Sequence, residues 1–450
     1  MSISLNPKTF EELPISKGLK KALTNSKFTH LKPIQSQAIP HLLAGRNVLG
    51  ASPTGSGKTL AFLVPAIELL TCSRARPAYG TISIILSPTR ELALQTFSVA
   101  KDLMKEISPT VMPIIGGSKG FKDEAYQLRT KGANLLIATP GKLKQHLEGG
   151  YVKLNHFQFL VIDEADRMLE AGFTNDLYSI FEYIKNPPQI ALFSATLTKD
   201  VEGLMKLNIT RPPIFCCPSN ASIVTTLDHC FAIVPFSDRI VVLGNILFQL
   251  LQMKKRVVCF VSNRKEAEFL TRLMNALDIS CDALHGELNQ AERNLAFVKF
   301  NRNETHVLFA TNVGSRGLDF PDVDWSISLG PPDRVKDYVH RAGRTARNEK
   351  SGRSLLLLSP NEEIFARRVS KHGIEIKKIE ITFDRSALDA MKGKIGEVMN
   401  SSRQFTELAL EAAFGFESTY QARPAEEGIK FDDVDMNEVR ESFGLEPEGK

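Results

Sequence analysis

The 450-residue chain is long enough for two domains with an appendage, and its 43% of apolar residues can fill large cores. No run approaches the ~18 consecutive apolar residues of a membrane-spanning helix, and residues 1–10 lack the apolar centre of a signal peptide. The six cysteines include no CxxC pair, which argues against a zinc ribbon or a disulfide framework and indicates a reducing compartment.

The net charge of +5 is unevenly distributed along the chain. Residues 424–450 hold nine acidic and three basic side chains, so residues 1–423 carry +11. A basic body is typical of proteins that bind a polyanion, but many soluble proteins are mildly basic and charge alone decides nothing.

Two short amphipathic helices are predicted before the first strand, over Leu19–Leu23 and Pro33–Leu43. Short aliphatic runs then alternate with helical segments up to about residue 215, and again from about 225 to 374. This alternation predicts an α/β fold with two tandem parallel sheets, whose ligands bind beyond the carboxyl ends of the strands. Prolines and small polar residues between the two series indicate a linker at 216–224, and residues 375–450 are expected to form a helical extension. The predicted strands are Asn47–Ala51, Thr81–Ser87, Val111–Ile115, Leu135–Ala138, Phe159–Ile162, Ile190–Phe193, Cys230–Val234, Arg256–Val261, Ser280–Leu284, Val307–Ala310, Trp325–Leu329 and Ser354–Leu358.

A glycine-rich stretch between the first predicted strand and a helix has the pattern of a phosphate-binding loop. Gly55 and Gly57 allow backbone N–H groups to face an anion, and the helix N-terminus adds positive potential. Lys58 can reach the β- and γ-phosphates, and the Thr59 hydroxyl can ligate Mg²⁺. The generic pattern has glycine at the position of Ser52, and a chance Gly-Lys-Thr sequence in a turn is the alternative. The stretch reads Ser52-Pro53-Thr54-Gly55-Ser56-Gly57-Lys58-Thr59.

Two acids directly follow the predicted strand Phe159–Ile162. Asp163 can hold Mg²⁺, partly through water, and Glu164 can orient and activate a water molecule. The alternative is a solvated turn. Two arginines in the second domain, Arg344 and Arg347, precede a loop in a domain that lacks its own phosphate loop. Such arginines can complete the site of the first domain, and a solvated basic helix end is the alternative.

The acidic tetrapeptide Asp163-Glu164-Ala165-Asp166 and a series of other motifs, in the expected order, resemble the DEAD-box RNA helicases. The resemblance covers about residues 10–360. It implies a two-domain, RecA-like, ATP- and Mg²⁺-dependent RNA helicase, with an adenine-recognition segment over 1–45, the domains at 46–215 and 225–374, and RNA as the partner. The other motifs are Ser87-Pro88-Thr89-Arg90-Glu91-Leu92-Ala93, Gly116-Gly117, Thr139-Pro140-Gly141, Ser194-Ala195-Thr196, Arg316-Gly317-Leu318-Asp319 and His340-Arg341-Ala342-Gly343-Arg344-Thr345-Ala346-Arg347.

The resemblance also assigns roles to individual residues. It implies that Phe10 stacks on adenine and that the Gln35 amide reads the edge of the base. The other residues that it assigns to ATP are Thr54, Gly55, Ser56, Gly57, Lys58, Thr59, Gly317 and Asp319. The residues that it assigns to coupling hydrolysis with domain closure are Ser194, Thr196, Asp166 and His340. The residues that it assigns to RNA are Pro88, Thr89, Arg90, Gly117, Thr139, Arg264, Gln290, Arg293 and Thr311.

The chain departs from the family pattern at several positions. Lys27 replaces a usual glycine, Lys142 a usual arginine, Asn312 a common aspartate and Ser52 a usual alanine. The Arg90–Glu91 dipeptide, without the family, would be read as a surface ion pair.

A narrower resemblance is carried by Leu135-Leu136-Ile137-Ala138, by Asp166-Arg167-Met168-Leu169-Glu170-Ala171-Gly172-Phe173, by Asp324-Trp325 and by the ending Ser442-Phe443-Gly444-Leu445. These are similar to the nucleolar DEAD-box subgroup that acts in ribosome assembly. This resemblance implies a monomer in the nucleus and nucleolus that acts on pre-ribosomal RNA, together with pre-ribosomal proteins or an activating cofactor.

The extension has two interpretations that the sequence leaves open. Apolar residues recur on one helical face from Met391 to Tyr420, and Asp435 with Glu438 resembles a capping box. Both helices could simply pack on the second domain. Alternatively, the acidic stretch 426–448 also competes electrostatically with RNA for the basic body.

Overall fold

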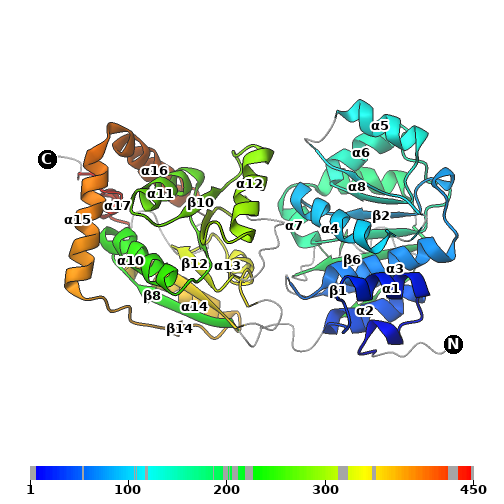
Figure 1. The fold of residues 1–450 in the computed structure, drawn as a ribbon, viewed down its shortest axis with the longest axis horizontal. Coiled ribbons are helices and arrows are strands. Elements are labelled where there is room, and N and C mark those ends of the chain that lie inside the picture. Colours follow the sequence, from blue (N-terminus) through cyan, green and yellow to red (C-terminus); the bar gives the residue numbers. More distant parts are fainter. Residues whose placement is uncertain are drawn as a thin grey trace. The chain divides into compact units, whose positions relative to one another are not determined.

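A computed structural model describes most of the chain, in two compact units, Met1–Ser222 and Ile223–Lys450 (Figure 1). In this part of the chain no helix is long and apolar enough to cross a membrane. The described residues are 7–52, 55–105, 107, 109–116, 120–185, 187–195, 201, 203–204, 211–217, 227–312, 323–346, 351–423 and 434–446, without the side chains of 290 and 294.

The first unit is built on a parallel sheet of seven strands in the order β3-β4-β2-β5-β6-β1-β7. The strand that precedes the glycine-rich loop, β1, lies beside β6, and β6 lies beside β5. The loop and the two acids that follow β5 therefore lie at the same edge of the sheet. The strands are β1 Val48–Ala51, β2 Ser83–Leu86, β3 Val111–Ile114, β4 Leu135–Ala138, β5 Phe159–Ile162, β6 Gln189–Ser194 and β7 Ile214–Cys216.

Helices cover both faces of this sheet because alternate strand residues point to opposite sides. Phe159 and Val161 of β5 pack in one core with α1 to α4, whereas Leu160 and Ile162 pack in a second core with α6 to α8. The helices are η1 Phe10–Glu12, α1 Lys17–Asn25, α2 Pro33–Leu43, α3 Lys58–Cys72, η2 Pro77–Tyr79, α4 Arg90–Leu103, α5 Phe121–Thr130, α6 Pro140–Glu148, α7 Ala165–Glu170 and α8 Thr174–Tyr183.

The second unit repeats this plan with a parallel sheet in the order β10-β11-β9-β12-β13-β8-β14. Its strands are β8 Leu227–Ile233, β9 Val257–Phe260, β10 Cys281–Leu284, β11 Val307–Ala310, β12 Trp325–Leu329, β13 Gly352–Leu358 and β14 Lys377–Lys378. Its helices are η3 Phe236–Asp238, α10 Arg239–Gln252, α11 Arg264–Ala276, α12 Gln290–Asn301, α13 Val335–Ala342, η4 Pro360–Glu362, α14 Glu363–Lys371, α15 Arg385–Ser401, α16 Arg403–Gln421 and α17 Met436–Ser442.

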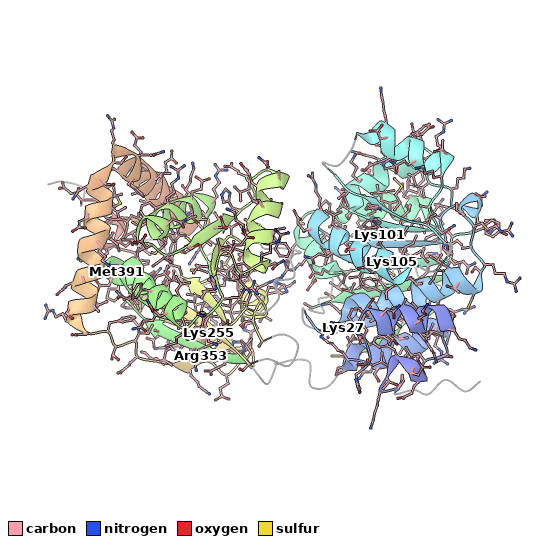
Figure 2. All side chains as sticks on the ribbon, in the orientation of Figure 1. Lys27, Lys101, Lys105, Lys255, Arg353 and Met391 are labelled. Carbon is pink, nitrogen blue, oxygen red and sulfur yellow. The ribbon has the colours of Figure 1, made fainter. Side chains whose placement is uncertain are left out.

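The C-terminal extension packs on this second unit. Helix α15 packs against α10, and α16 packs against α11 (Figure 1). Met391 of α15 is labelled in Figure 2. It approaches α10 so closely that a β-carbon at Gly244 would lie 3.2 Å from its sulfur. Just after α16, the side chain of Arg423 is 3% exposed, and its Nη2 donates to the Pro331 carbonyl at 2.8 Å. The packing interpretation of the extension is therefore confirmed, while residues 426–433, 447 and 448 of the acidic stretch lie outside the described residues.

The structure corrects the sequence prediction in three places. The proposed linker begins one residue too early, because Cys216 belongs to β7, an edge strand that pairs with β1. The short strand β14 was not predicted. The single helix expected over Met391–Tyr420 is two helices, because Ser402 adopts an extended conformation and its Oγ accepts a hydrogen bond from Gln404 N–H. A serine N-cap starts a new helix and ends the old one.

The second residue after α1 explains a departure from the family pattern. The side chain of Lys27 is labelled in Figure 2. Its backbone has φ 62°, in the left-handed region that favours glycine. The backbone conformation that a glycine would supply is thus kept, at the expense of strain in an exposed lysine.

We expect Lys27→Gly to stabilise the first unit by about 0.5–1 kcal/mol, because it removes left-handed strain from a β-carbon. For a unit of this size, each kcal/mol of added stability raises the thermal midpoint by about 2–4 °C. Differential scanning calorimetry would measure it. The matched control is Lys21→Gly, inside α1, which should lower the midpoint. A lower midpoint for Lys27→Gly would contradict the strain argument.

Candidate nucleotide and RNA site

The phosphate loop takes the conformation that its glycines permit. Gly55 has φ 81° and Gly57 has φ 92°. Gly57 is the N-cap of α3, and Lys58 is the first residue of that helix. The N–H groups of the first turn of α3 therefore lie at the carboxyl end of β1, as an anion site requires. Ser56 and Thr59 are half-buried in this loop, and Thr54 lies outside the described residues.

Gln35 joins the N-terminal segment to the loop. Its Oε1 accepts a hydrogen bond from Lys32 N–H at 2.8 Å, and its Nε2 donates to the Gly57 carbonyl at 2.9 Å. The side chain is 2% exposed, so Gln35 is not a surface residue. A β-carbon at Gly57 would lie 2.4 Å from Gln35 Nε2. The Oε1 and Nε2 atoms of Gln35 can each form one further hydrogen bond. The role of Gln35 in adenine recognition stays a prediction.

Phe10 belongs to the same N-terminal segment as Gln35, and its side chain is buried in the protein core. It is 3% exposed and packs in the same core as α1 to α4. Its backbone N–H donates to the Thr29 carbonyl at 3.1 Å, which joins η1 to the segment before α2. Stacking of its ring on adenine stays a prediction.

Buried charges of opposite sign face the loop. Lys58 is 7% exposed, its Nζ donates to the Ser52 carbonyl at 2.6 Å, and burial lowers its pKa against the opposing effect of nearby acids. Asp163 is 3% exposed, and its pKa is raised to about 7, first by burial and then by the Glu164 carboxylate, while Lys58 opposes the shift. These groups are desolvated and mutually close, which is the arrangement expected of a catalytic centre.

The start of α7 fixes the two acids that follow Asp163. Glu164 is the N-cap residue, with φ 50°, and is 7% exposed. Its Oε2 lies 3.5 Å from Arg167 Nε. Asp166 is 2% exposed, and its Oδ1 accepts from Arg167 N–H at 3.0 Å. The alternative of a solvated turn is therefore wrong.

The end of β6 lies between the loop that follows β1 and the acids that follow β5. Ser194 is fully buried, and its carbonyl accepts a hydrogen bond from Ser52 N–H at 3.0 Å. The first residue of the Ser-Ala-Thr motif is therefore tied to the start of the phosphate loop. Thr196 lies outside the described residues.

The residues assigned to RNA in the first unit lie after β2 and β4. Pro88 is buried, and the Thr89 hydroxyl accepts from Leu92 N–H at 3.3 Å to cap α4. A β-carbon at Gly116 would lie 2.9 Å from Arg90 Nη2, so the exposed guanidinium lies against the Gly-Gly motif. Glu91 is 7% exposed, which excludes a solvated Arg90–Glu91 pair. Thr139 is 9% exposed at the N-cap of α6; Gly117 lies outside the described residues.

Lys142, the departure from a usual arginine, has two partners in α5. Its Nζ lies 3.6 Å from the Glu124 carboxylate and 5.3 Å from the centre of the Phe121 ring. The buried His146 also pairs with Glu124, at 3.0 Å. Sequence reasoning missed Glu124 and His146, because nothing in their spacing links α5 to α6.

In the second unit the predicted residues occupy the ends of strands and the starts of helices. Arg264 is the first residue of α11 and is ion-paired with Glu287. Gln290 is the first residue of α12, and Arg293 is half-buried one turn later. Thr311 follows β11 and is 9% exposed.

The helix α13 and the turn after it carry the basic motif of the second unit. His340 is 7% exposed and Arg344 is 3% exposed, and Arg344 Nε donates to the His340 carbonyl at 3.2 Å. The alternative of a solvated basic helix end is therefore wrong for Arg344. Arg341, which sequence reasoning did not single out, donates from Nε to Asn312 Oδ1 at 2.7 Å. Gly317, Asp319 and Arg347 lie outside the described residues.

Comparison with known proteins matches both units. The family model of the DEAD/DEAH box helicases matches residues 32–204, and that of the helicase conserved C-terminal domain matches residues 239–349. DEAD-box ATP-dependent RNA helicase 27 of Arabidopsis thaliana is 39% identical over 443 residues, covering 97% of this chain and 69% of that protein. ATP-dependent RNA helicase HAS1 of Saccharomyces cerevisiae is 38% identical, covering 97% of this chain and 86% of that protein.

The chain belongs to the DEAD-box ATP-dependent RNA helicases. A solved structure of Mss116p bound to ssRNA and AMP-PNP is similar with a TM-score of 0.83 and 26% identity, covering 99% of this chain and 92% of that one. Dbp5 of S. cerevisiae bound to RNA and ADP BeF3 is similar with a TM-score of 0.75 and 25% identity, covering 86% of this chain and 100% of that one. The family and the paired RecA-like fold expected from the motifs are confirmed.

The Gly57–Gln35 contact gives this DEAD-box site a direct test. Gly57→Ala should abolish nucleotide binding, because φ 92° strains any β-carbon and the new methyl group would meet Gln35 Nε2. Gly18→Ala is the control, since a β-carbon there meets nothing within 4 Å. Binding of a fluorescent ATP analogue reports the result, and parental affinity in Gly57→Ala would refute the contact.

Proposed function

We propose that this protein couples RNA-stimulated ATP hydrolysis to local unwinding of RNA duplexes or remodelling of RNA–protein complexes. The observation that carries the proposal is the buried group of Lys58, Asp163 and Glu164 beside a loop held by Gln35. Nucleotide binding requires a cation that contacts the phosphates, such as Lys58. A second buried acid after β5, here Glu164, is required only for ATP hydrolysis. This argues against the alternative of an ATP-gated clamp or scaffold.

The residues fit a nucleotide with Mg²⁺. The positive φ angles of Gly55 and Gly57 form a cradle at the start of α3, and Asp163 is a desolvated carboxylate whose raised pKa a cation would lower. Thr59 and Asp163 would hold the ion, partly through water, and it would neutralise charge on the phosphates. Lys58 moves from the Ser52 carbonyl to the phosphates, Gln35 and Phe10 meet the adenine, and Glu164 orients the attacking water.

The second unit supplies the remaining groups of this proposal. Arg344 and Arg347 stabilise charge on the transferred phosphoryl group, an effect worth roughly 10³–10⁵ in rate for an arginine finger. Gly317 and Asp319 meet the nucleotide. Ser194, Thr196, Asp166 and His340 couple hydrolysis to the change in domain arrangement.

The RNA is bound through its backbone. Hydroxyls, arginines and glycine N–H groups contact phosphate and sugar and carry no base information. The assigned groups, with Pro88, Thr89, Arg90, Gly117 and Thr139 in the first unit and Arg264, Gln290, Arg293 and Thr311 in the second, are of these kinds. Recognition is therefore nearly independent of sequence, and the 2′-hydroxyl distinguishes RNA from DNA.

The substrate in this proposal is pre-ribosomal RNA in the nucleolus, where the protein acts as a monomer, with pre-ribosomal proteins or an activating cofactor. Similarity to HAS1 over 97% of the chain supports it, as does the helical extension that packs on the second unit. Crosslinking followed by RNA sequencing would identify the RNA.

We expect single-stranded RNA to stimulate ATP hydrolysis and DNA of the same sequence not to do so. The reason is that the protein contacts the 2′-hydroxyl of the sugar, which DNA lacks. RNA affinity should also fall steeply with salt. A phosphate-release assay with both strands measures this. Glu164→Gln is the control: it should bind ATP and lose turnover, whereas Lys58→Ala should lose binding. Equal stimulation by DNA would contradict the RNA assignment, and parental turnover in Glu164→Gln would contradict the role of that acid.

Arg347→Lys should lose ATP turnover while RNA binding and thermal stability are kept, because a point charge does not replace a planar fork that binds phosphate oxygens in pairs. Single-turnover hydrolysis with saturating RNA measures the effect. The control is Arg403→Lys, an exposed arginine paired with Glu407 within α16, which should behave as the parent. Full turnover in Arg347→Lys would remove the arginine-finger role.

A further inference from the structure

The residue that opens α2 is unsuited to capping a helix. Lys32 is the N-cap, with φ −75° and ψ 158°, and its side chain makes no capping hydrogen bond. Serine, threonine, aspartate and asparagine are preferred there because a side-chain oxygen can accept a hydrogen bond from a free N–H group of the first turn. An ammonium group offers no acceptor. Local helix stability therefore gives no reason for a lysine at this position.

The lysine side chain runs instead to the phosphate loop. Lys32 Nζ donates to the Gly55 carbonyl at 3.2 Å. Its Cδ lies against the loop two residues later, since a β-carbon at Gly57 would be 2.9 Å from it. The backbone N–H of the same lysine holds Gln35 Oε1, and Gln35 Nε2 holds the Gly57 carbonyl. One residue thus contacts the loop through its own ammonium group and through Gln35.

We propose that Lys32 is a positioning residue for the nucleotide, a second cation of the phosphate loop besides Lys58. This rests on the proposed nucleotide site. The ammonium group holds the Gly55 carbonyl on the outer side of the loop, so that the loop N–H groups stay turned toward the phosphates. Its charge also adds positive potential next to a polyanion. Lys32 is half-buried, so water screens this charge less than that of a fully exposed lysine.

The alternative is an ordinary surface lysine that meets a carbonyl by chance. Exposed charge interactions are worth little, and in that case removal of the charge would leave nucleotide affinity unchanged. The two explanations also differ in ligand dependence. A cation that acts through the loop and the triphosphate must affect ATP and ADP, but not adenosine, which carries no phosphate.

The N-cap position allows an experiment that separates function from folding. Lys32→Thr and Lys32→Asn remove the cation and restore side chains that cap helices well. Both should keep or raise the thermal midpoint, yet weaken ATP-analogue binding by about threefold to tenfold, the scale of one modest charge interaction. The KM for ATP should rise, with kcat at saturating ATP unchanged. Lys32→Arg should retain the parental KM because it keeps a donor and a charge.

The control removes a lysine of the same unit that lies elsewhere. Lys17→Thr, at the exposed first residue of α1, should leave affinity for ATP unchanged. The readouts are titration calorimetry with AMP-PNP, ADP and adenosine, and ATPase kinetics. Unchanged AMP-PNP affinity in both Lys32→Thr and Lys32→Asn, or an equal loss for adenosine, would overturn the inference. If the parent itself bound no nucleotide, or Lys58→Ala bound it normally, the proposed function would fail instead.

Discussion

The hydrogen bond from Gln35 to the Gly57 carbonyl is the contact on which the nucleotide site depends. It joins α2, which precedes the sheet, to the loop that follows β1. The approach is so close that only glycine fits at position 57, and the left-handed conformation at that residue requires glycine for a second reason. The N-terminal segment is therefore part of the phosphate site, although no strand of the sheet comes from it.

The acids at the site are kept buried next to a cation that is itself desolvated. Burial lowers the pKa of Lys58 and raises that of Asp163, and each charge opposes the shift of the other. Such a pair costs free energy in the absence of a ligand. A nucleotide with a divalent cation would give both groups better partners, so the cost is recovered on binding. This is the physical reason for placing both groups at the carboxyl ends of β1 and β5.

Much of this site could be predicted from the sequence, because its chemistry follows from short motifs after buried strands. The strands Leu135–Ala138, Phe159–Ile162, Val307–Ala310 and Trp325–Leu329 were predicted with the observed bounds. Three features could not be predicted. The edge strand Ile214–Cys216 follows two prolines that read as a break, and its pairing with β1 is a tertiary effect.

The second feature is the burial of Gln35 and of Phe10, which no local pattern gives. The third is the break of the long C-terminal helix at Ser402. Serine is tolerated inside helices as well as at caps, so the choice between the two depends on packing. Here α15 must follow α10 while α16 follows α11, and a single straight helix could not lie along both.

The departures from the family pattern keep the local geometry, but they remove a charge or lower the stability. Lys27 retains the left-handed turn of a glycine. Asn312 accepts the same hydrogen bond from Arg341 that an aspartate would, but without a negative charge. Arg341 is fully desolvated, and burial lowers its pKa to about 10, against the effect of Asp337 and Asp333. It therefore stays protonated at neutral pH with a neutral partner, and more distant acids balance its charge. A neutral partner binds the guanidinium less tightly than a carboxylate, so the hydrogen bond between Asn312 and Arg341 ties α13 to the end of β11 less firmly than an aspartate would.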